Sequence, residues 1–397
     1  MKYMKFLTVF SVMTLLTCQC IQAQKKWVGT WATAIERPLN KNDMPRTSLT
    51  DHALRQIIHV SLGGKKLRLQ LSNEMSTQPV EIKSVYIANA TDSGAAIEPK
   101  TAQYLTFNGK PSVTIEAGKA IYTDVLKYKL KPLQRLSITI NYGQTPTQAT
   151  THRGSRTTSY IMEGESTPTT EFKTMEKVEH WYNIAALEVE GNEKTRCIAC
   201  LGNSITDGRG TTTDKQNRWT DVLAEKLQGK VGVLNLGIGG NCVVKGGLSL
   251  PAIKRFDRDI LGQQGVTDLI IFEGINDIGG MKNDSKERTQ QVIKAYKHFI
   301  DKAHARGIKV YGGTITQIKN TGYWSDAQEK ARQTINQWIR TAGNFDGLID
   351  FEKAVASPQD ADAMRDDLKF DDLHPNAEGY RLLGECAAEA VKEQTSK

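Results

Sequence analysis

Five short apolar runs, separated by segments of helical periodicity, dominate the second half of the chain. The runs occupy residues 197–201, 231–236, 269–273, 309–315 and 348–351. Continuous apolar runs of this length are typical of strands buried on both faces, and helices between such strands require a parallel sheet that is covered on both sides. The sequence therefore predicts an α/β fold for the region that follows Gly191.

The helices predicted in this region each have one apolar face. In the clearest case, apolar side chains recur at helical spacing ahead of Gly307, which ends the segment. These side chains are Val292, Tyr296, Phe299, Ile300 and Ala303. The last predicted helix groups Tyr380, Leu383, Ala387 and Val391 in the same way.

Residues 27–190 follow a different pattern, in which apolar and polar residues alternate with a period of two. Segments 54–60 and 67–72 flank residues 63–66, which begin with two glycines, and this arrangement predicts a β-hairpin. Segments 80–87 and 136–142 continue the alternation. We therefore expect a jelly-roll-like β-sandwich ahead of the α/β region.

The 397 residues are too many for one small core, so we expect two domains, a β-sandwich at 24–190 and an α/β domain at 191–397. A signal peptide at 1–23 is expected to precede them. Two lysines, an apolar run and the small residue Ala23 predict the signal peptide. Because the apolar run is shorter than the ~20 residues of a membrane span, the peptide implies a periplasmic or secreted protein. Lipidation at Cys18 or Cys20 is a less favoured alternative.

Short polar motifs stand at the ends of predicted elements in the α/β region. Ser204 follows the first strand, Asn276 follows the third, and Asp371 and His374 precede the last helix. Parallel sheets bind ligands at the carboxyl ends of their strands, so these motifs are expected to meet. A serine hydroxyl becomes nucleophilic when an imidazole accepts its proton, and a carboxylate holds that imidazole in the right tautomer. We therefore interpret Ser204, His374 and Asp371 as a catalytic triad.

Donors for a developing oxyanion are predicted beside the nucleophile. The amide of Asn276 follows the third strand, and Gly239 and Gly240 follow the second. Glycines allow a backbone N–H to approach a substrate oxygen closely. With the backbone N–H of Ser204, these groups predict an oxyanion hole.

Taken together, these motifs resemble the SGNH family, also called GDSL esterases and lipases. The residues that give the family its name match here Ser204, Gly240, Asn276 and His374. Gly239 is an alternative to Gly240. The resemblance covers residues 196–395 and implies ester hydrolysis on a flavodoxin-like parallel sheet, with Asp371 as the acid of the triad. One residue departs from the pattern, because Asn203 stands where the family usually has an aspartate.

A narrower resemblance concerns the substrate. Segments 27–32, 206–210, 217–219 and 255–259 are similar to a subgroup of arylesterases and acylhydrolases associated with xylan degradation. This resemblance implies hydrolysis of acyl esters, acetyl esters in particular, on a plant polysaccharide such as xylan or pectin. The alternatives are a lipid acylhydrolase or lysophospholipase, and a non-catalytic polysaccharide-binding protein. No long apolar lid flanks the motifs, which argues against long acyl chains.

Other features of the sequence exclude several function classes. A net charge of +8, spread along the chain, is not typical of a nucleic-acid-binding protein. Cys197 and Cys200 lie three positions apart in a predicted strand and point to opposite faces, so we interpret them as buried thiols. The histidines outside the motifs lack metal-ligand spacing. We expect no metal, no cofactor, no nucleic-acid partner and no stable membrane insertion; the expected partner is an acylated carbohydrate or a small ester.

Several side chains have two interpretations. Trp219 and Trp324 are either core residues or platforms for a sugar ring. Arg218 either binds an acidic group of the substrate or pairs with Asp221 one helical turn later. Trp181, near the domain boundary, is a candidate to reach the active site. The N-terminal domain itself binds carbohydrate, shapes the mouth of the active site, or only stabilises the catalytic domain.

Overall fold

The computed structural model of the chain describes residues 25–91, 94–281, 285–341 and 345–393. The predicted signal peptide at 1–23 and the alternative lipidation sites Cys18 and Cys20 lie outside the described residues. Within the described ranges, no helix combines the length and the apolar character needed to cross a membrane.

A parallel sheet forms the centre of the C-terminal region, and each of the five predicted runs supplies one strand. The strands are β15 (Cys197–Gly202), β16 (Gly232–Gly237), β17 (Asp268–Phe272), β18 (Lys309–Gly313) and β19 (Gly347–Ile349). They lie in the order β16-β15-β17-β18-β19, with parallel pairing throughout. Numbered along the chain, this order is 2-1-3-4-5, which is that of flavodoxin-like sheets. Cys197 and Cys200 are buried in β15 as free thiols.

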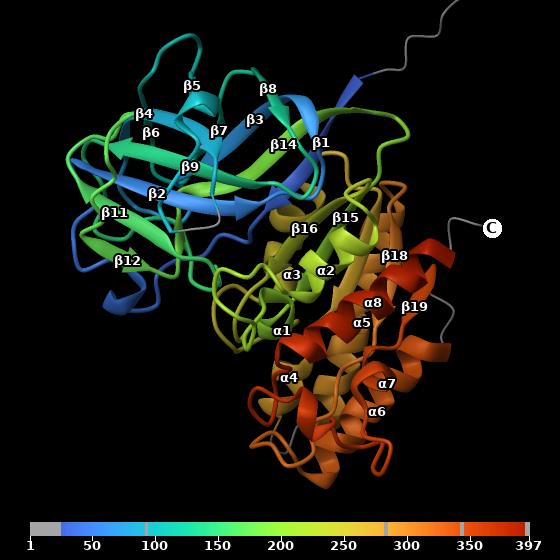
Figure 1. Cartoon of the computed structure of the whole chain (residues 1–397). Coiled ribbons are helices and arrows are strands. Elements are labelled where there is room, and N and C mark those ends of the chain that lie inside the picture. The colour runs from blue at the N-terminus through green and yellow to red at the C-terminus, as the bar shows by residue number, and fades with distance from the viewer. Residues whose placement is uncertain (1–24, 92–93, 282–284, 342–344, 394–397) are drawn as a thin grey trace, which may run out of the picture.

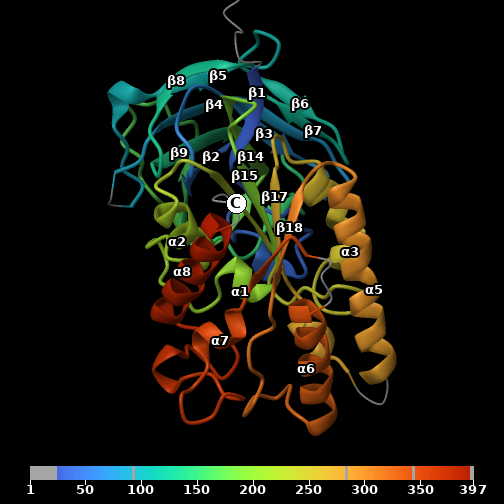
Figure 2. The ribbon, with the colours of Figure 1, turned by 90° about the vertical axis from the view of Figure 1, so that its right-hand side faces the viewer.

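Helices cover both faces of this sheet. The helices are α1 (Ser204–Asp207), α2 (Trp219–Lys226), α3 (Ala252–Phe256), α4 (Ile275–Gly279), α5 (Ser285–His304), α6 (Asp326–Thr341), α7 (Phe351–Val355) and α8 (Ala377–Glu393). Figure 2 shows α2 and α8 on one side of the sheet and α3 and α5 on the other. The predicted apolar face of α5 is buried, as is that of α8. Burial of these stripes holds the helices against the sheet, because most of the stability of a helix in a protein comes from packing of its apolar face.

The N-terminal region is rich in antiparallel sheet, as predicted. Its strands are β1 (Lys25–Ala32), β2 (His52–His59), β3 (Gly64–Ser72), β4 (Val80–Asn89), β5 (Gln103–Leu105), β6 (Val113–Ile115), β7 (Ala120–Tyr122), β8 (Leu126–Leu130), β9 (Arg135–Tyr142), β10 (Thr151–His152), β11 (Ser159–Glu163), β12 (Glu176–Val178), β13 (Trp181–Tyr182) and β14 (Ile184–Asn192). One sheet has the order β1-β14-β3-β7, with β8 also on β3, and a second has the order β12-β11-β2-β9-β4-β5, with β6 also on β4. Strands β10 and β13 form a separate pair. The jelly-roll connectivity and the domain boundaries stay predictions.

The predicted hairpin of segments 54–60 and 67–72 is wrong. Both segments form strands, but β2 pairs with β9 and β11, whereas β3 pairs with β14, β7 and β8. The chain therefore crosses from one sheet to the other between β2 and β3. Leu54 of β2 and Leu69 of β3 both contribute to the shared apolar core. An alternating pattern identifies a strand with one buried face, but it does not identify the strand's partner.

The antiparallel sheet that contains β1 packs directly against β16 of the parallel sheet (Figure 1). Residues 193–196 join β14 to β15, and β1 lies against β16. The N–H of Gly29 in β1 donates to the carbonyl of Gln264 at 3.0 Å. A Cβ atom at Gly29 would lie 2.9 Å from the side chain of Leu234 in β16, so the two sheets approach closely here. A single cluster of buried apolar side chains includes residues of both regions.

Candidate active site

Ser204 stands at the carboxyl end of β15, on the first position of the one-turn helix α1. The helix is capped by Asn203, whose side-chain oxygen accepts the N–H of Ile205 at 3.0 Å. The residue that departs from the family pattern thus serves as the cap, and Ser204 does not. The N–H of Ser204 lies in the first turn, where a helix has no internal acceptor for it. The side-chain hydroxyl and the backbone N–H of Ser204 are therefore both available to a substrate.

The three predicted triad residues meet in hydrogen-bond geometry. Ser204 Oγ lies 2.8 Å from His374 Nε2. His374 Nδ1 lies 2.9 Å from each carboxylate oxygen of Asp371. Because a carboxylate only accepts, Nδ1 carries the proton and Nε2 is free to accept that of the serine. Asp372, the neighbouring carboxylate, is exposed and does not take this place.

The protonation states that catalysis requires follow from the surroundings. Burial lowers the pKa of His374 below its ordinary 6.5, although Asp371 opposes this shift. Burial also opposes ionisation of Asp371, but the N–H groups of His374 and Leu373, at 2.7 and 2.9 Å from its Oδ1, outweigh that effect and lower the pKa of the carboxyl. At neutral pH the pair is therefore a neutral imidazole beside a carboxylate.

The amide of Asn276 is fixed in orientation. Its Nδ2 donates to the carbonyl of Asn241 at 2.8 Å, and its Oδ1 accepts the hydroxyl of Tyr323 at 3.0 Å. The second N–H of the amide keeps no other partner in the described part of the chain. Tyr323, which orients this amide, was not identified from the sequence. It precedes α6 in a loop, and no local pattern marks it.

Both candidate glycines line the same pocket as Ser204 and His374. Gly240 has a φ of +70°, a left-handed conformation that favours glycine, and its carbonyl accepts the N–H of Leu248 at 2.8 Å. Within the described ranges, the N–H groups of Gly239 and Gly240 have no hydrogen-bond partner. The geometry leaves either N–H available to an oxyanion. The choice of Gly240 stays a prediction.

The pocket encloses about 300 Å³ and has walls from both regions of the chain. The C-terminal region contributes the triad serine and histidine and the oxyanion candidates. The N-terminal region contributes Arg153, Gly154 and Arg156, from the loop after β10. Of the roles left open for the N-terminal domain, the structure therefore shows that it forms part of the pocket wall.

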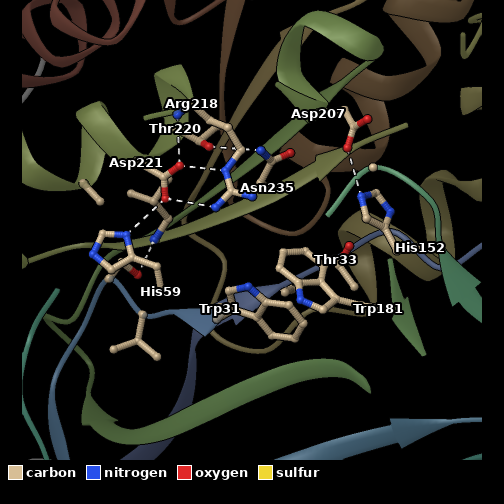
Figure 3. Close-up of a pocket in the computed structure, with 16 residues that line it drawn as sticks. Trp31, Thr33, His59, His152, Trp181, Asp207, Arg218, Thr220, Asp221 and Asn235 are labelled. Atoms are coloured by element: carbon tan, nitrogen blue, oxygen red, sulfur yellow. Dashed lines mark hydrogen bonds and ion pairs between the residues drawn. The ribbon is translucent and has the colours of Figure 1, made fainter. Parts of the chain in front are cut away.

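A second histidine–aspartate pair joins the two regions close to Ser204. Asp207, the last residue of α1, accepts from His152 Nε2 at 2.9 Å and from Arg156 Nη2 at 3.1 Å. His152 Nδ1 lies 2.8 Å from the carbonyl of Ala34, so both ring nitrogens donate and the ring is an imidazolium. Figure 3 shows His152 directed at Asp207 across the buried junction.

The electrostatics of this pair differ from those of the triad. Burial opposes a charge on His152, but Asp207 outweighs it and raises the pKa of the ring. Burial likewise opposes ionisation of Asp207, but Arg156 and His152 outweigh it and lower the pKa of the carboxyl. The sequence offered one signal of this network, the three basic residues within 152–156, and we assigned no role to them.

Burial settles the alternatives for three of the side chains with two interpretations, whereas Trp324 is 46% exposed and so is not a core residue. Arg218 is buried and pairs with Asp221, Nε to Oδ2 at 2.6 Å, so it does not face the substrate pocket (Figure 3). Trp219 is completely buried against Phe272 and Phe351. Trp181 is also buried, contrary to the suggestion that it reaches the active site. All three side chains are enclosed by protein, so they contribute to packing and not to substrate binding.

Residues 200–382 match the model of the GDSL-like Lipase/Acylhydrolase family. A search of curated proteins gave no match. Solved structures that resemble the chain include a member of the lipolytic protein G-D-S-L family from Veillonella parvula, at 22% identity and a TM-score of 0.39, covering 50% of this chain and 99% of the other.

Two further solved structures have similar coverage. An acetyl xylan esterase is 22% identical, with a TM-score of 0.38, over 49% of this chain and 99% of its own. Est24, a carbohydrate acetylesterase from Sinorhizobium meliloti, is 15% identical, with a TM-score of 0.40, over 50% of this chain and 99% of its own.

The match of the family model spans the elements that carry Ser204, Asn276 and His374. Residues 200–382 are therefore similar to the GDSL-like lipase/acylhydrolase family, and this protein is a carboxylic ester hydrolase.

Proposed function

We propose that the protein is an exported serine esterase that removes short acyl groups, acetyl above all, from plant polysaccharides such as xylan or pectin. The observation that carries the catalytic part is the continuous hydrogen-bonded chain from Ser204 Oγ through His374 to Asp371. Export is proposed from the charged and apolar start of the sequence.

In the proposed mechanism, Ser204 Oγ attacks the acyl carbon while His374 Nε2 accepts its proton. The N–H groups of Ser204 and Gly240 and the amide of Asn276 hold the oxyanion; one such donor contributes about 3–4 kcal/mol to transition-state stabilisation. His374 then protonates the leaving alcohol. A water molecule, deprotonated by the same ring, releases the acid from Ser204.

The pocket supports a small acyl group on a polar alcohol. It encloses about 300 Å³, and Leu248, Leu373 and Tyr323 are its only large apolar or aromatic contributions among the described residues. Its N-terminal wall is polar, with Arg153 and Arg156. A long acyl chain gains its binding energy from apolar area, and this pocket offers little.

The test is acetate release from acetylated xylan and acetylated pectin by the wild-type protein and by Ser204→Ala. We expect release from at least one polymer by the wild type, and none above background by the folded variant. Release that persists in Ser204→Ala would refute the mechanism. Faster hydrolysis of long-chain than of acetyl esters would instead favour a lipid substrate.

A further inference from the structure

Cationic side chains surround the pocket on the side of the imidazole. Arg156 and Arg209 both line it together with Ser204 and His374. Arg209 Nε lies 3.6 Å from Asp371 Oδ2, and Arg156 Nη2 lies 3.1 Å from Asp207 Oδ2. The two arginines therefore approach the reacting groups from two directions, one beside the triad carboxylate and one beside the helix of the nucleophile.

Both guanidinium groups have donors to spare. Each carries five N–H donors, of which Arg156 uses one and Arg209 forms only a long ion pair. In the described part of the chain, their remaining terminal nitrogens have no partner. Their side chains are 26% and 53% exposed, so a ligand in the pocket can reach them. Arg153 differs, because Glu36 accepts from its Nε and Nη2 at 3.1 and 2.6 Å.

Position in the reaction indicates which part of the ester the arginines face. His374 delivers a proton to the leaving alcohol, so that alcohol must lie on the imidazole side of Ser204. Arg209 adjoins Asp371, and the charges of Arg209 and Arg156 both act on the His374 ring. The oxyanion candidates Gly240 and Asn276 lie on other loops of the pocket. The cations thus face the alcohol and not the acyl group.

We propose that Arg156 and Arg209 bind a carboxylate on the alcohol part of the ester, so that the preferred substrate is an acylated acidic sugar, a uronic acid, rather than a neutral one. This inference rests on the proposed esterase function and narrows its substrate class. Arginine matches a carboxylate with two parallel hydrogen bonds, whereas a neutral sugar leaves both guanidinium groups without a charged partner.

Matched small esters test the hydrolytic side of the proposal. The pair that differs only in the alcohol is phenyl acetate and 3-acetoxybenzoate; monophenyl succinate and phenyl butanoate place the difference in the acyl group. At low ionic strength we expect kcat/KM for 3-acetoxybenzoate to exceed that for phenyl acetate about ten-fold, since charged hydrogen bonds are the strong ones. A preference for the succinate alone would overturn the assignment to the alcohol side.

Substitutions of the two arginines test whether they cause the preference for the acidic ester. The ratio of acidic to neutral kcat/KM should fall toward one in Arg156→Gln and in Arg209→Gln, and should persist only in part in Arg209→Lys, which keeps the charge but loses the pair of parallel hydrogen bonds. The control is Arg381→Gln, since Arg381 is an exposed arginine of α8 that pairs with Glu378 and Glu385. Should Arg156→Gln fail to fold, Arg209→Gln decides the matter alone. A wild-type ratio near one, or a ratio that neither glutamine variant changes, would overturn the proposal.

A binding measurement separates this proposal from the esterase function. Galacturonate and galactose are titrated into the Ser204→Ala protein by calorimetry, with no turnover required. We expect galacturonate to bind about ten-fold more tightly than galactose, and Arg209→Gln to remove the difference. Equal binding of the two sugars would contradict the arginine site even in an active esterase. Tight galacturonate binding by a wild type without hydrolysis would contradict only the esterase function.

Discussion

At the scale of residues, the decisive contact is that between Ser204 Oγ and His374 Nε2, at 2.8 Å. The contact is productive only while the ring is neutral. Burial keeps it neutral by lowering its pKa, and Asp371 fixes the tautomer through Nδ1. By contrast His152, equally close to an aspartate, is charged, because both of its nitrogens donate. The same residue pair thus holds a neutral ring at Ser204, as the proposed mechanism requires, and a charged ring at the contact between the two regions.

This difference predicts the pH dependence of activity. The base must be deprotonated, so kcat/KM should rise with pH and level off, with the midpoint of the acidic limb below 6.5, the ordinary pKa of histidine. The positive charge of Arg209 contributes to the low pKa, so Arg209→Gln should move the limb to higher pH. The pH profile of 4-nitrophenyl acetate hydrolysis checks both. A midpoint well above 6.5 in the wild type would contradict the assignment.

A second residue-scale prediction concerns Tyr323. Its hydroxyl orients the amide of Asn276, and the change Tyr323→Phe removes only that bond. A hydrogen bond of this kind contributes about 0.5–1.5 kcal/mol, so we expect kcat to fall about two- to ten-fold with little change in KM. Tyr104→Phe, at an exposed position of β5, is the control. An unchanged kcat in Tyr323→Phe would show that the amide needs no such support.

At the scale of elements, the loop after β10 reaches across to helix α1. Gly154 in this loop lies so close to Asp207 that a Cβ atom there would stand 1.9 Å from Oδ2. Only glycine permits this approach, which also brings Arg156 within reach of the carboxylate. The loop thereby connects helix α1, which carries Ser204, to the N-terminal sheets.

The change Gly154→Ala should therefore separate the loop from α1. We expect a loss of about 1–3 kcal/mol in the free energy of unfolding, as for other overpacked sites, and a lower melting temperature. Gly322→Ala provides the comparison, because a Cβ atom there would meet nothing within 4 Å. Equal stability of the two variants would show that the loop adapts without cost.

The strands of the parallel sheet were predictable to within two residues at every end, since continuous apolar runs between amphipathic helices leave few alternatives. The antiparallel pairings were not. Strands β2 and β3 were both recognised, yet the hairpin between them was wrong, because period-two alternation reports a buried face and is silent about the partner. The hydrogen-bonded arrangement of Ser204, His374 and Asp371 was predictable because the histidine and the aspartate lie in one loop and the serine in a recognisable motif.

At the scale of the whole molecule, the pocket belongs to both regions. The sequence could not show that Arg153 and Arg156 line it, because their approach to Asp207 depends on how the antiparallel sheets dock on β16. Tyr323 was missed for a similar reason, since a loop residue acquires its role only through the fold. The least predictable parts of the site are thus those that tertiary packing brings in.

This shared construction predicts that the C-terminal region does not function alone. A fragment that starts at residue 191 loses β1 and the rest of the first sheet, and it exposes apolar side chains of β16 such as Leu234. We expect this fragment to aggregate or to lose most hydrolysis of 4-nitrophenyl acetate, as judged by size-exclusion chromatography and initial rates. A monomeric fragment with full activity would contradict the structural dependence.

The most direct test of the central claim, that Ser204 is the nucleophile of an ester hydrolase, is the kcat/KM for 4-nitrophenyl acetate of the wild type and of Ser204→Ala, with circular dichroism to confirm that both are folded. We expect hydrolysis by the wild type and a loss of at least about a thousand-fold in the variant, since loss of the nucleophile removes covalent catalysis. A folded Ser204→Ala protein with activity close to that of the wild type would contradict it.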